Sequence, residues 1–252
     1  METLNKIVDY CNDLLNIDQF NDYCPNGLQV QGRPEVRRIV GGVTASRALI
    51  DAAVDAGADA ILVHHGYFWK GEDATLTGMK YERVKRLIEA GISLIGYHLP
   101  LDAHPRYGNN AQLAKSLGLT VDGGFARHGR VDIAQYGHLQ QPLTATGFAQ
   151  LLTDELGREP MQIVGHDREI AKIGWCTGAA QGYIDEAAAL GLDAYISGEV
   201  SEHTWHAARE LEVDYFAAGH HATERYGVMA LGQHLTEHFA LEFNFIDLEN
   251  PV

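Results

Sequence analysis

The sequence predicts an α/β protein made of two related, interlinked α/β/α lobes. Short β-branched runs alternate with helical stretches, a pattern that favours parallel sheets with crossover helices. An internal repeat gives the second indication, because residues 50–60 match residues 184–194 at six of eleven positions. Histidines and carboxylates directly follow the predicted strands, and open α/β folds place their ligands at such strand ends.

The elements of the first lobe can be assigned in chain order. Residues 4–15 predict an amphipathic helix, since their apolar side chains fall on one side. Residues 38–43 predict a buried strand, after which Thr44 or Ser46 would cap a helix that ends at Gly57. A strand, a helix and a further strand follow at residues 60–63, around 84–90 and at 93–97.

The repeat predicts a second lobe of the same kind. Residues from about 123 to 143 are rich in Gly, His and Gln, and they predict antiparallel strands or the junction between the halves. We therefore place the lobes at residues 1–124 and 125–252, related by a pseudo-twofold axis. The alternative is that two α/β units look alike by chance. Against it, residues 98–102 and 220–224 occupy corresponding positions, and each segment is followed by Tyr-Gly.

Composition narrows the class of protein. With 252 residues, 46% of them hydrophobic, the chain can bury a real core. No apolar run approaches the roughly 18–20 residues that span a bilayer, and the N-terminus does not resemble a signal peptide. Three cysteines without a C-x-x-C pair argue against a disulfide scaffold and a thiolate metal site. We expect a cytoplasmic protein without a membrane partner, and the net charge of −15 disfavours nucleic acid.

Two polar clusters follow strands of the first lobe. His64 and His65 follow residues 60–63, and neighbouring side chains on a continuing strand would point to opposite faces. We therefore expect the strand to end at Val63, so that both imidazoles enter one site. His98 and Asp102 have helical spacing, but Pro100 between them opposes a helix and predicts a loop.

The second lobe carries a third cluster. A helix that starts near His220 would place His220 and Glu224 on one face. Taken alone, such residues are more often structural histidines or a solvated helix face, and a helix with His203 and His206 could equally be surface. Together, five to six imidazole and carboxylate ligands suffice for two divalent ions, with Zn, Mn, Fe and Co all compatible. A sulfur-free ligand set favours an open, reactive site over structural zinc.

Five segments resemble the YbgI family, the GTP cyclohydrolase I type 2 homologues of the Nif-three-like group, and the resemblance covers essentially the whole chain. The segments are VHHGYFW at 63–69, YHLPLDAH at 97–104, SGE at 197–199, AGHHATER at 218–225 and YCPNGLQV at 23–30. The resemblance implies two interlinked α/β domains and a homohexameric ring with a dinuclear metal site in each subunit. The implied metal ligands are His64, His65, Asp102, His220 and Glu224, with Glu224 bridging the ions. His98 lies outside that set, which makes it a candidate acid/base or a residue that supports the ligands.

Two functions remain open. The first is a metal-dependent hydrolase that acts on a nucleotide or another small metabolite, with GTP cyclohydrolase-like activity suggested by resemblance alone. The second is a non-catalytic metal-binding or assembly protein whose ring serves storage or protein interaction. The sequence contains no Walker A motif, no Gly-x-Gly-x-x-Gly and no Gly-x-Ser-x-Gly, so nothing favours a phosphate-cradling loop or a serine nucleophile.

Overall fold

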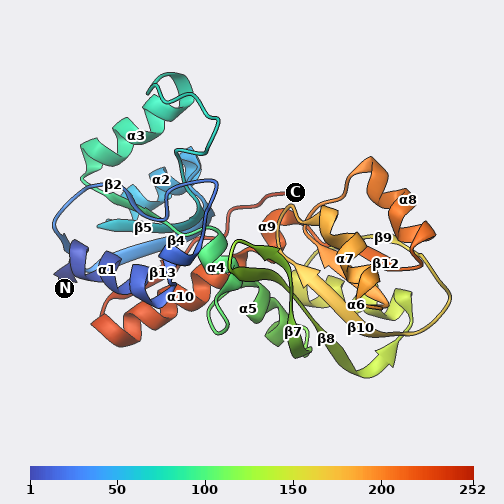
Figure 1. Cartoon of the computed structure of the whole chain (residues 1–252). Coiled ribbons are helices and arrows are strands. Elements are labelled where there is room, and N and C mark those ends of the chain that lie inside the picture. Colours follow the sequence, from blue (N-terminus) through green and yellow to red (C-terminus); the bar gives the residue numbers. More distant parts are fainter. The chain divides into compact units, whose positions relative to one another are not determined.

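The computed structural model describes residues 1–252, which form two compact units (Figure 1). The first unit consists of Met1–Leu101 and Gly227–Glu249, and the second of Asp102–Tyr226 and Asn250–Val252. These units differ from lobes of residues 1–124 and 125–252 in two respects. The chain enters the second unit already at Asp102, and its C-terminal part returns to the first unit. The return follows from strand pairing, because β13 (Glu242–Phe245) adds in parallel to β4 (Arg38–Thr44).

The first unit contains a five-stranded sheet in the order β13-β4-β5-β6-β2. Strands β13, β4, β5 and β6 are parallel, and β2 pairs antiparallel with β6. The elements are β1 (Glu2–Thr3), α1 (Leu4–Leu14), η1 (Ile17–Gln19), β2 (Gly27–Val30), β3 (Glu35–Val36), β4, α2 (Arg47–Asp55), β5 (Ala60–His65), α3 (Gly78–Ala90), β6 (Ser93–Gly96), α10 (Arg225–Phe239) and β13.

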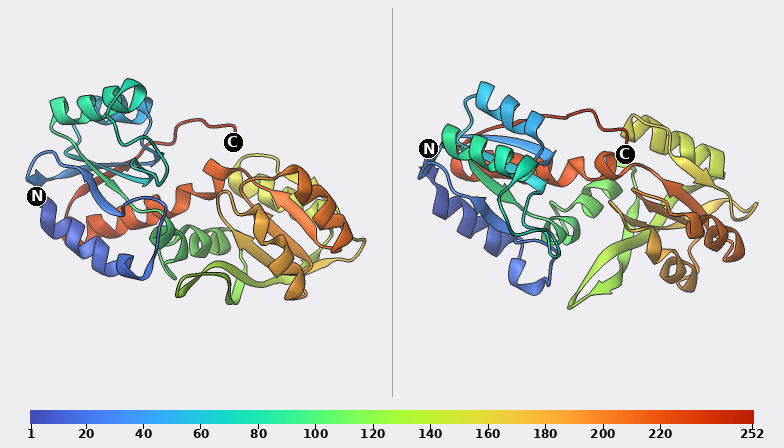
Figure 2. Two further views of the ribbon diagram at one scale, coloured as in Figure 1. Left: turned by 45° about the horizontal axis from the view of Figure 1, so that its top comes forward. Right: turned by 90° about the horizontal axis from the view of Figure 1, so that it is seen from above.

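Helices cover both faces of this sheet, which makes three layers (Figures 1 and 2). Along β5, Ala60 and Leu62 pack into one core with α1 and α10, whereas Ile61 and Val63 pack into another with α2 and α3. A strand buried on both faces explains the continuous apolar run in the sequence. Ser46 caps α2 by accepting a hydrogen bond from the Leu49 amide, so the predicted start of this helix is confirmed.

The second unit contains a six-stranded sheet in the order β7-β8-β10-β11-β12-β9, again between two layers of helices. Strands β7 and β8 form an antiparallel pair over the segment where the sequence predicted antiparallel strands or a junction. The elements are α5 (Asn109–Ser116), β7 (Thr120–His128), β8 (Val131–Leu143), α6 (Ala145–Leu156), β9 (Met161–Ile163), β10 (Ile170–Cys176), η2 (Gln181–Tyr183), α7 (Ile184–Ala189), β11 (Ala194–Ser197), α8 (Glu202–Glu210), β12 (Asp214–Ala217) and α9 (His220–Thr223).

The two sheets share one topology. The order β4-β5-β6-β2 in the first matches β10-β11-β12-β9 in the second, with three parallel strands and one antiparallel edge in each. The repeat extends to single hydrogen bonds. Asp59 Oδ2 accepts from the amides of Arg37 and Arg38, at 2.9 and 3.0 Å. Asp193 Oδ2 likewise accepts from two successive amides at the start of β10, at 3.0 and 2.9 Å. The internal repeat read from the sequence therefore agrees with the structure.

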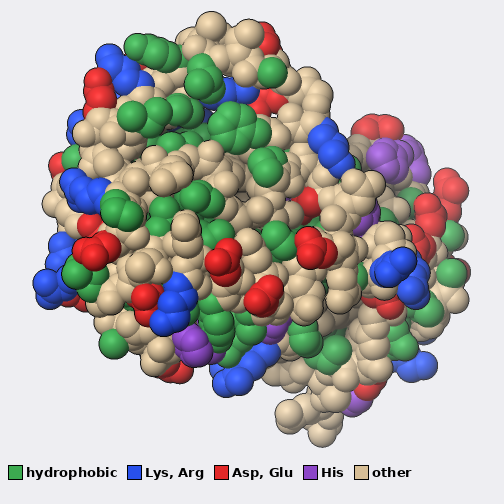
Figure 3. All heavy atoms as spheres, turned by 60° about the vertical axis from the view of Figure 1, so that its left-hand side comes forward, with side chains coloured by type: hydrophobic (Ala, Val, Ile, Leu, Met, Phe, Trp, Pro, Cys, Tyr) green, Lys and Arg blue, Asp and Glu red, His purple; other side chains and the backbone are tan.

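The face drawn in Figure 3 carries side chains of both charges. Basic and acidic side chains are interspersed around hydrophobic ones, so the net negative charge does not make this face uniformly acidic. None of the helices is both long enough and apolar enough to cross a membrane.

Candidate metal-binding sites

Three histidines gather at the carboxyl end of the first unit's sheet. One ligand atom each of His64, His65 and His98 lies within 4.8 Å of the others. The ring centroids of His64 and His65 are 4.6 Å apart, and those of His64 and His98 are 5.1 Å apart. The expectation that the strand ends at Val63 is wrong, because β5 continues through His65. Side chains at a strand end lean along the strand direction, which lets neighbouring rings converge without a break in the strand.

Hydrogen bonds at Nδ1 orient two of these rings. His64 Nδ1 lies 2.9 Å from the carbonyl oxygen of Tyr97, and His98 Nδ1 lies 2.7 Å from Asp22 Oδ1. A carbonyl or an ionised carboxylate only accepts, so Nδ1 donates in each pair and Nε2 keeps the lone pair of the neutral ring. Histidines that bind metals usually have their second nitrogen fixed in this way.

Asp22 is a buried carboxylate whose oxygens are held by four groups. Oδ1 accepts from His98 Nδ1 and from the Tyr23 amide, while Oδ2 accepts from Asn26 Nδ2 and the Leu99 amide. Burial alone would raise the pKa of Asp22, but these hydrogen bonds and the nearby His98 hold it below the ordinary value. The sequence did not identify Asp22 as a site residue. The motif at residues 23–30, which follows it directly, was the available signal.

A short helix, rather than a loop, begins directly after His98 and contains Asp102. Helix α4 spans Leu99–Ala103, so the expectation of a loop is wrong. Pro100 lies in the first turn, where the missing N–H costs no helical hydrogen bond. Asn26 supports this start, since its side-chain oxygen accepts from the His98 amide at 2.8 Å. The boundary between the two units falls within α4, between Leu101 and Asp102.

In the second unit His220 lies between two carboxylates. Its Nδ1 is 2.7 Å from Glu199 Oε1, and its Nε2 is 3.1 Å from Glu224 Oε2. Helix α9 spans His220–Thr223, so the predicted helix start at His220 is confirmed, and Glu224 directly follows the last residue of this helix. Burial would lower the pKa of His220, but hydrogen bonds to Glu224 and Glu199 and their negative charges raise it to about 9.

Glu224 and Asp102 are buried carboxylates, and each is in close contact with residues of the second unit. Asp102 Oδ1 accepts from Asn109 Nδ2 at 2.9 Å and from the Thr177 hydroxyl at 3.1 Å. Gly178 has a φ of +70°, and a Cβ added there would collide with Glu224 Oε1. Glycine at this position therefore lets the Glu224 carboxylate lie against the backbone. No role for Asn109, Thr177 or Gly178 was predicted from the sequence.

Most other titratable candidates lie away from these clusters. His203 and His206 are exposed on α8, so the surface interpretation of that helix is correct. All three cysteines are free and buried, and burial raises the pKa of Cys11 and of Cys24 to about 12. Cys24 nevertheless offers a sulfur within 4.8 Å of ligand atoms of Asp22 and His98.

The donors in the two units fit divalent metal ions. The first unit offers imidazoles whose Nδ1 atoms are fixed by oxygens of the protein. The second offers the buried carboxylates of Asp102 and Glu224, and an imidazole beside Glu224 that is held in the same way. Nitrogen and oxygen donors of this kind suit Zn, Mn, Fe and Co.

The family model for Duf34/NIF3 (NGG1p interacting factor 3) matches residues 2–251. Relatives named GTP cyclohydrolase 1 type 2 homolog come from Pseudomonas aeruginosa and Vibrio cholerae. The first is 55% identical and covers 98% of each chain, and the second is 54% identical and covers 96% of each chain.

Solved structures of the same fold are also similar. A structure described as "protein ybgI, unknown function" covers 100% of both chains with a TM-score of 0.95 and 47% identity. A protein from Thermus thermophilus covers 100% of both chains with a TM-score of 0.90 and 31% identity. Reduced HcgD from Methanocaldococcus jannaschii covers 98% of both chains with a TM-score of 0.85, and its 22% identity shows the fold alone.

Proposed function

Because the chain belongs to the Duf34/NIF3 family, we propose that it binds two divalent metal ions and uses them to hydrolyse a small metabolite. The proposed ligands are His64, His65, Asp102, His220 and Glu224. The observation that carries the proposal is the hydrogen bonding of the histidines. His64 and His220 each have Nδ1 bound to an oxygen acceptor, so Nε2 is the nitrogen that would bind a metal. In His220 this nitrogen lies 3.1 Å from Glu224 Oε2, and a metal would take the place of its proton.

Connectivity along the chain supports a joint role for the two sets of ligands. Asp102 is the first residue of the second unit, and it follows His98 by four positions through α4. Glu224 precedes by three positions Gly227, where the chain re-enters the first unit. Asp102, a carboxylate of the second unit, is thus joined through α4 to the end of β6, only four residues after His98.

Two divalent ions held by these ligands would supply Lewis-acid polarisation and a water whose pKa is lowered to about 7. Within the chain, His98 is the proposed proton carrier. Asp22 holds His98 with Nδ1 protonated, so Nε2 can accept a proton and later return it. The buried, hydrogen-bonded Asp22 would stabilise the protonated imidazole that forms in between.

The test is a hydrolysis screen with metal-loaded protein against nucleoside triphosphates including GTP, phosphate esters and small amides. We expect turnover that disappears when the metal is removed and that falls by about 10²–10⁴ in His98→Gln, with metal content unchanged. His206→Gln, an exposed histidine, serves as the matched control. If the fully loaded wild type turns over nothing in the panel, the hydrolase is refuted and a non-catalytic metal-binding protein is favoured.

A homohexameric ring in the cytoplasm completes the proposal. The ring rests on the family resemblance, and the cytoplasmic location is supported by three free, buried cysteines in the structure. Light scattering coupled to size exclusion is expected to give six times the chain mass of 27.7 kDa. A monomer or dimer at micromolar concentration would contradict the ring.

A further inference from the structure

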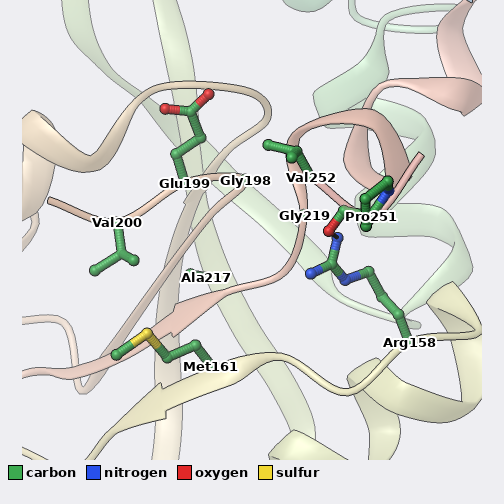
Figure 4. Close-up of a pocket in the computed structure, with 9 residues that line it drawn as sticks. All are labelled: Arg158, Met161, Gly198, Glu199, Val200, Ala217, Gly219, Pro251 and Val252. Atoms are coloured by element: carbon green, nitrogen blue, oxygen red, sulfur yellow. Dashed lines mark hydrogen bonds between the residues drawn. The ribbon is translucent and has the colours of Figure 1, made fainter.

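The second unit contains a cavity of about 380 Å³, a size typical of small-molecule sites (Figure 4). Its walls come from the segment after α6, the loop after β11, the end of β12 and the C-terminal segment. The residues that line it are Arg158, Met161, Gly198, Glu199, Val200, Ala217, Gly219, Pro251 and Val252.

Arg158 brings a positive charge into this cavity. Its Nη1 donates a hydrogen bond of 3.0 Å to the carbonyl oxygen of Pro251, and it forms no ion pair with a carboxylate of the chain. A guanidinium has five N–H donors in a planar fork, which matches the oxygens of a carboxylate or a phosphate. Most of those donors remain for a ligand.

The backbone at Gly219 makes room for this guanidinium. Gly219 has a φ of +100°, and a Cβ added there would collide with Arg158 Nη1. In Figure 4 the end of the Arg158 side chain lies beside Gly219 and Pro251. A side chain at 219 would displace the guanidinium, so glycine at this position leaves room for Arg158 at the cavity wall.

The other residues that line the cavity indicate that the ligand also has an apolar part. Met161, Val200 and Ala217 provide an apolar surface, which suits the body of a small molecule rather than a bare ion. Glu199 also lines the cavity, and its Oε1 is the partner of His220 Nδ1. A ligand in this cavity would therefore lie against the residue whose carboxylate orients a proposed metal ligand.

We propose that this cavity binds the substrate of the enzyme, a small molecule with an apolar body and an oxyanion group that pairs with Arg158. The assignment to the substrate rests on the proposed function, whereas binding of the oxyanion does not need a metal. The oxyanion is either a phosphate or a carboxylate, since the fork of Arg158 recognises both.

The test measures binding of three ring compounds to metal-free wild-type protein by isothermal titration calorimetry. Phenyl phosphate and benzoate carry the two oxyanions, and benzyl alcohol is the neutral counterpart. We expect one or both anions to bind and benzyl alcohol to bind at least tenfold more weakly. Arg158→Met is expected to raise the Kd of the bound anion by about tenfold or more, and Arg158→Lys by less, because lysine keeps the charge without the fork.

Arg130→Gln removes an exposed arginine from the hairpin between β7 and β8 and is expected to leave the Kd unchanged. Preference for phenyl phosphate would assign a phosphate-bearing substrate, and preference for benzoate a carboxylate. The proposal is overturned if no anion binds, if benzyl alcohol binds equally well, or if Arg158→Met leaves the Kd unchanged. Because the protein is metal-free here, failure of this site is distinct from failure of the metal proposal, which metal content decides.

Discussion

Asp22 Oδ1 lies 2.7 Å from His98 Nδ1, and the same carboxylate accepts from the amides on both sides of this link, those of Tyr23 and Leu99. One buried side chain thus fixes the ring of His98 and ties the segment before β2 to the start of α4. In the proposed mechanism this pair determines that Nε2 of His98, rather than Nδ1, accepts and returns the proton.

Asp22→Asn is expected to disturb the ring of His98 without unfolding the protein. The amide NH₂ must face at least one of the N–H donors that the carboxylate now accepts from, so we expect a loss of about 1–3 kcal/mol in the free energy of unfolding. Long-range ¹H–¹⁵N spectra should show His98 as the Nδ1–H form in the wild type and as a mixture in the variant. Asp18→Asn, at an exposed aspartate in η1, is the control. An unchanged His98 spectrum in Asp22→Asn would refute the positioning role.

Gly178→Ala is expected to weaken metal binding through Glu224. Gly178 and Gly191 have similar positive φ values of +70° and +67°, so alanine strains the backbone alike at both positions, by about 1 kcal/mol. A Cβ at 178 would collide with the Glu224 carboxylate, whereas a Cβ at 191 meets nothing within 4 Å. Metal titrations should therefore show weaker binding in Gly178→Ala and unchanged binding in Gly191→Ala. Equal affinities in the two variants would contradict the role assigned to Glu224.

Metal affinity is expected to fall as the pH falls below 9. Glu224 and Glu199 raise the pKa of His220 from 6.5 to about 9, so at neutral pH the His220 ring of the metal-free protein is an imidazolium with protons on both nitrogens. A metal must displace one of these protons, and each displaced proton weakens binding by about tenfold per pH unit below the pKa. Competition titrations at pH 7.0 and 8.5 measure this slope.

Glu199→Gln tests whether the Glu199 charge contributes to the raised pKa of His220. Loss of the Glu199 charge lowers the pKa of His220, so the slope between pH 7.0 and 8.5 should become shallower. His206→Gln should keep the wild-type slope. An affinity that does not change over this range in the wild type is incompatible with a protonated His220.

Asp59→Ala and Asp193→Ala are expected to destabilise the protein to a similar extent. Each carboxylate accepts two backbone amides at the start of a strand, in β4 and β10 respectively. Loss of these charge-assisted hydrogen bonds should lower the free energy of unfolding by about 1–3 kcal/mol in each variant. Urea titrations would measure this, with the exposed Asp55→Ala expected within about 0.5 kcal/mol of wild type. A large cost at one aspartate and none at the other would argue against equivalent roles.

Patterns that depend on local periodicity were predictable from the sequence. The apolar periodicity of α1 and the buried strand at residues 38–43 were expected from the sequence, and the structure confirms both. Of the two caps considered for the next helix, Thr44 and Ser46, the structure shows Ser46. The match between residues 50–60 and 184–194 likewise corresponds to two sheets of the same order. Residue spacing also predicted that the side chains of His220 and Glu224 lie close together, and they are 3.1 Å apart at Nε2 and Oε2.

Features that depend on distant partners were not predictable in this way. The C-terminal strand β13 returns to β4, and nothing within residues 242–245 specifies a partner some 200 positions earlier. Asp22 gained its role only from contact with His98, 76 positions away. The expectation of a loop around Pro100 was wrong, because the effect of proline depends on its position in the helix. Proline is tolerated in the first turn, where it lies here.

The metal content of each chain tests the central claim most directly. Elemental analysis of wild-type protein, purified and then reloaded with Zn, Mn, Fe or Co, is expected to give two ions per chain. His64→Ala and Glu224→Ala, which alter one ligand in each unit, should each bind less metal, while His206→Gln should match the wild type. A wild-type protein that stays metal-free after reloading, or variants that retain the full content, would contradict the claim that these residues hold a pair of metal ions.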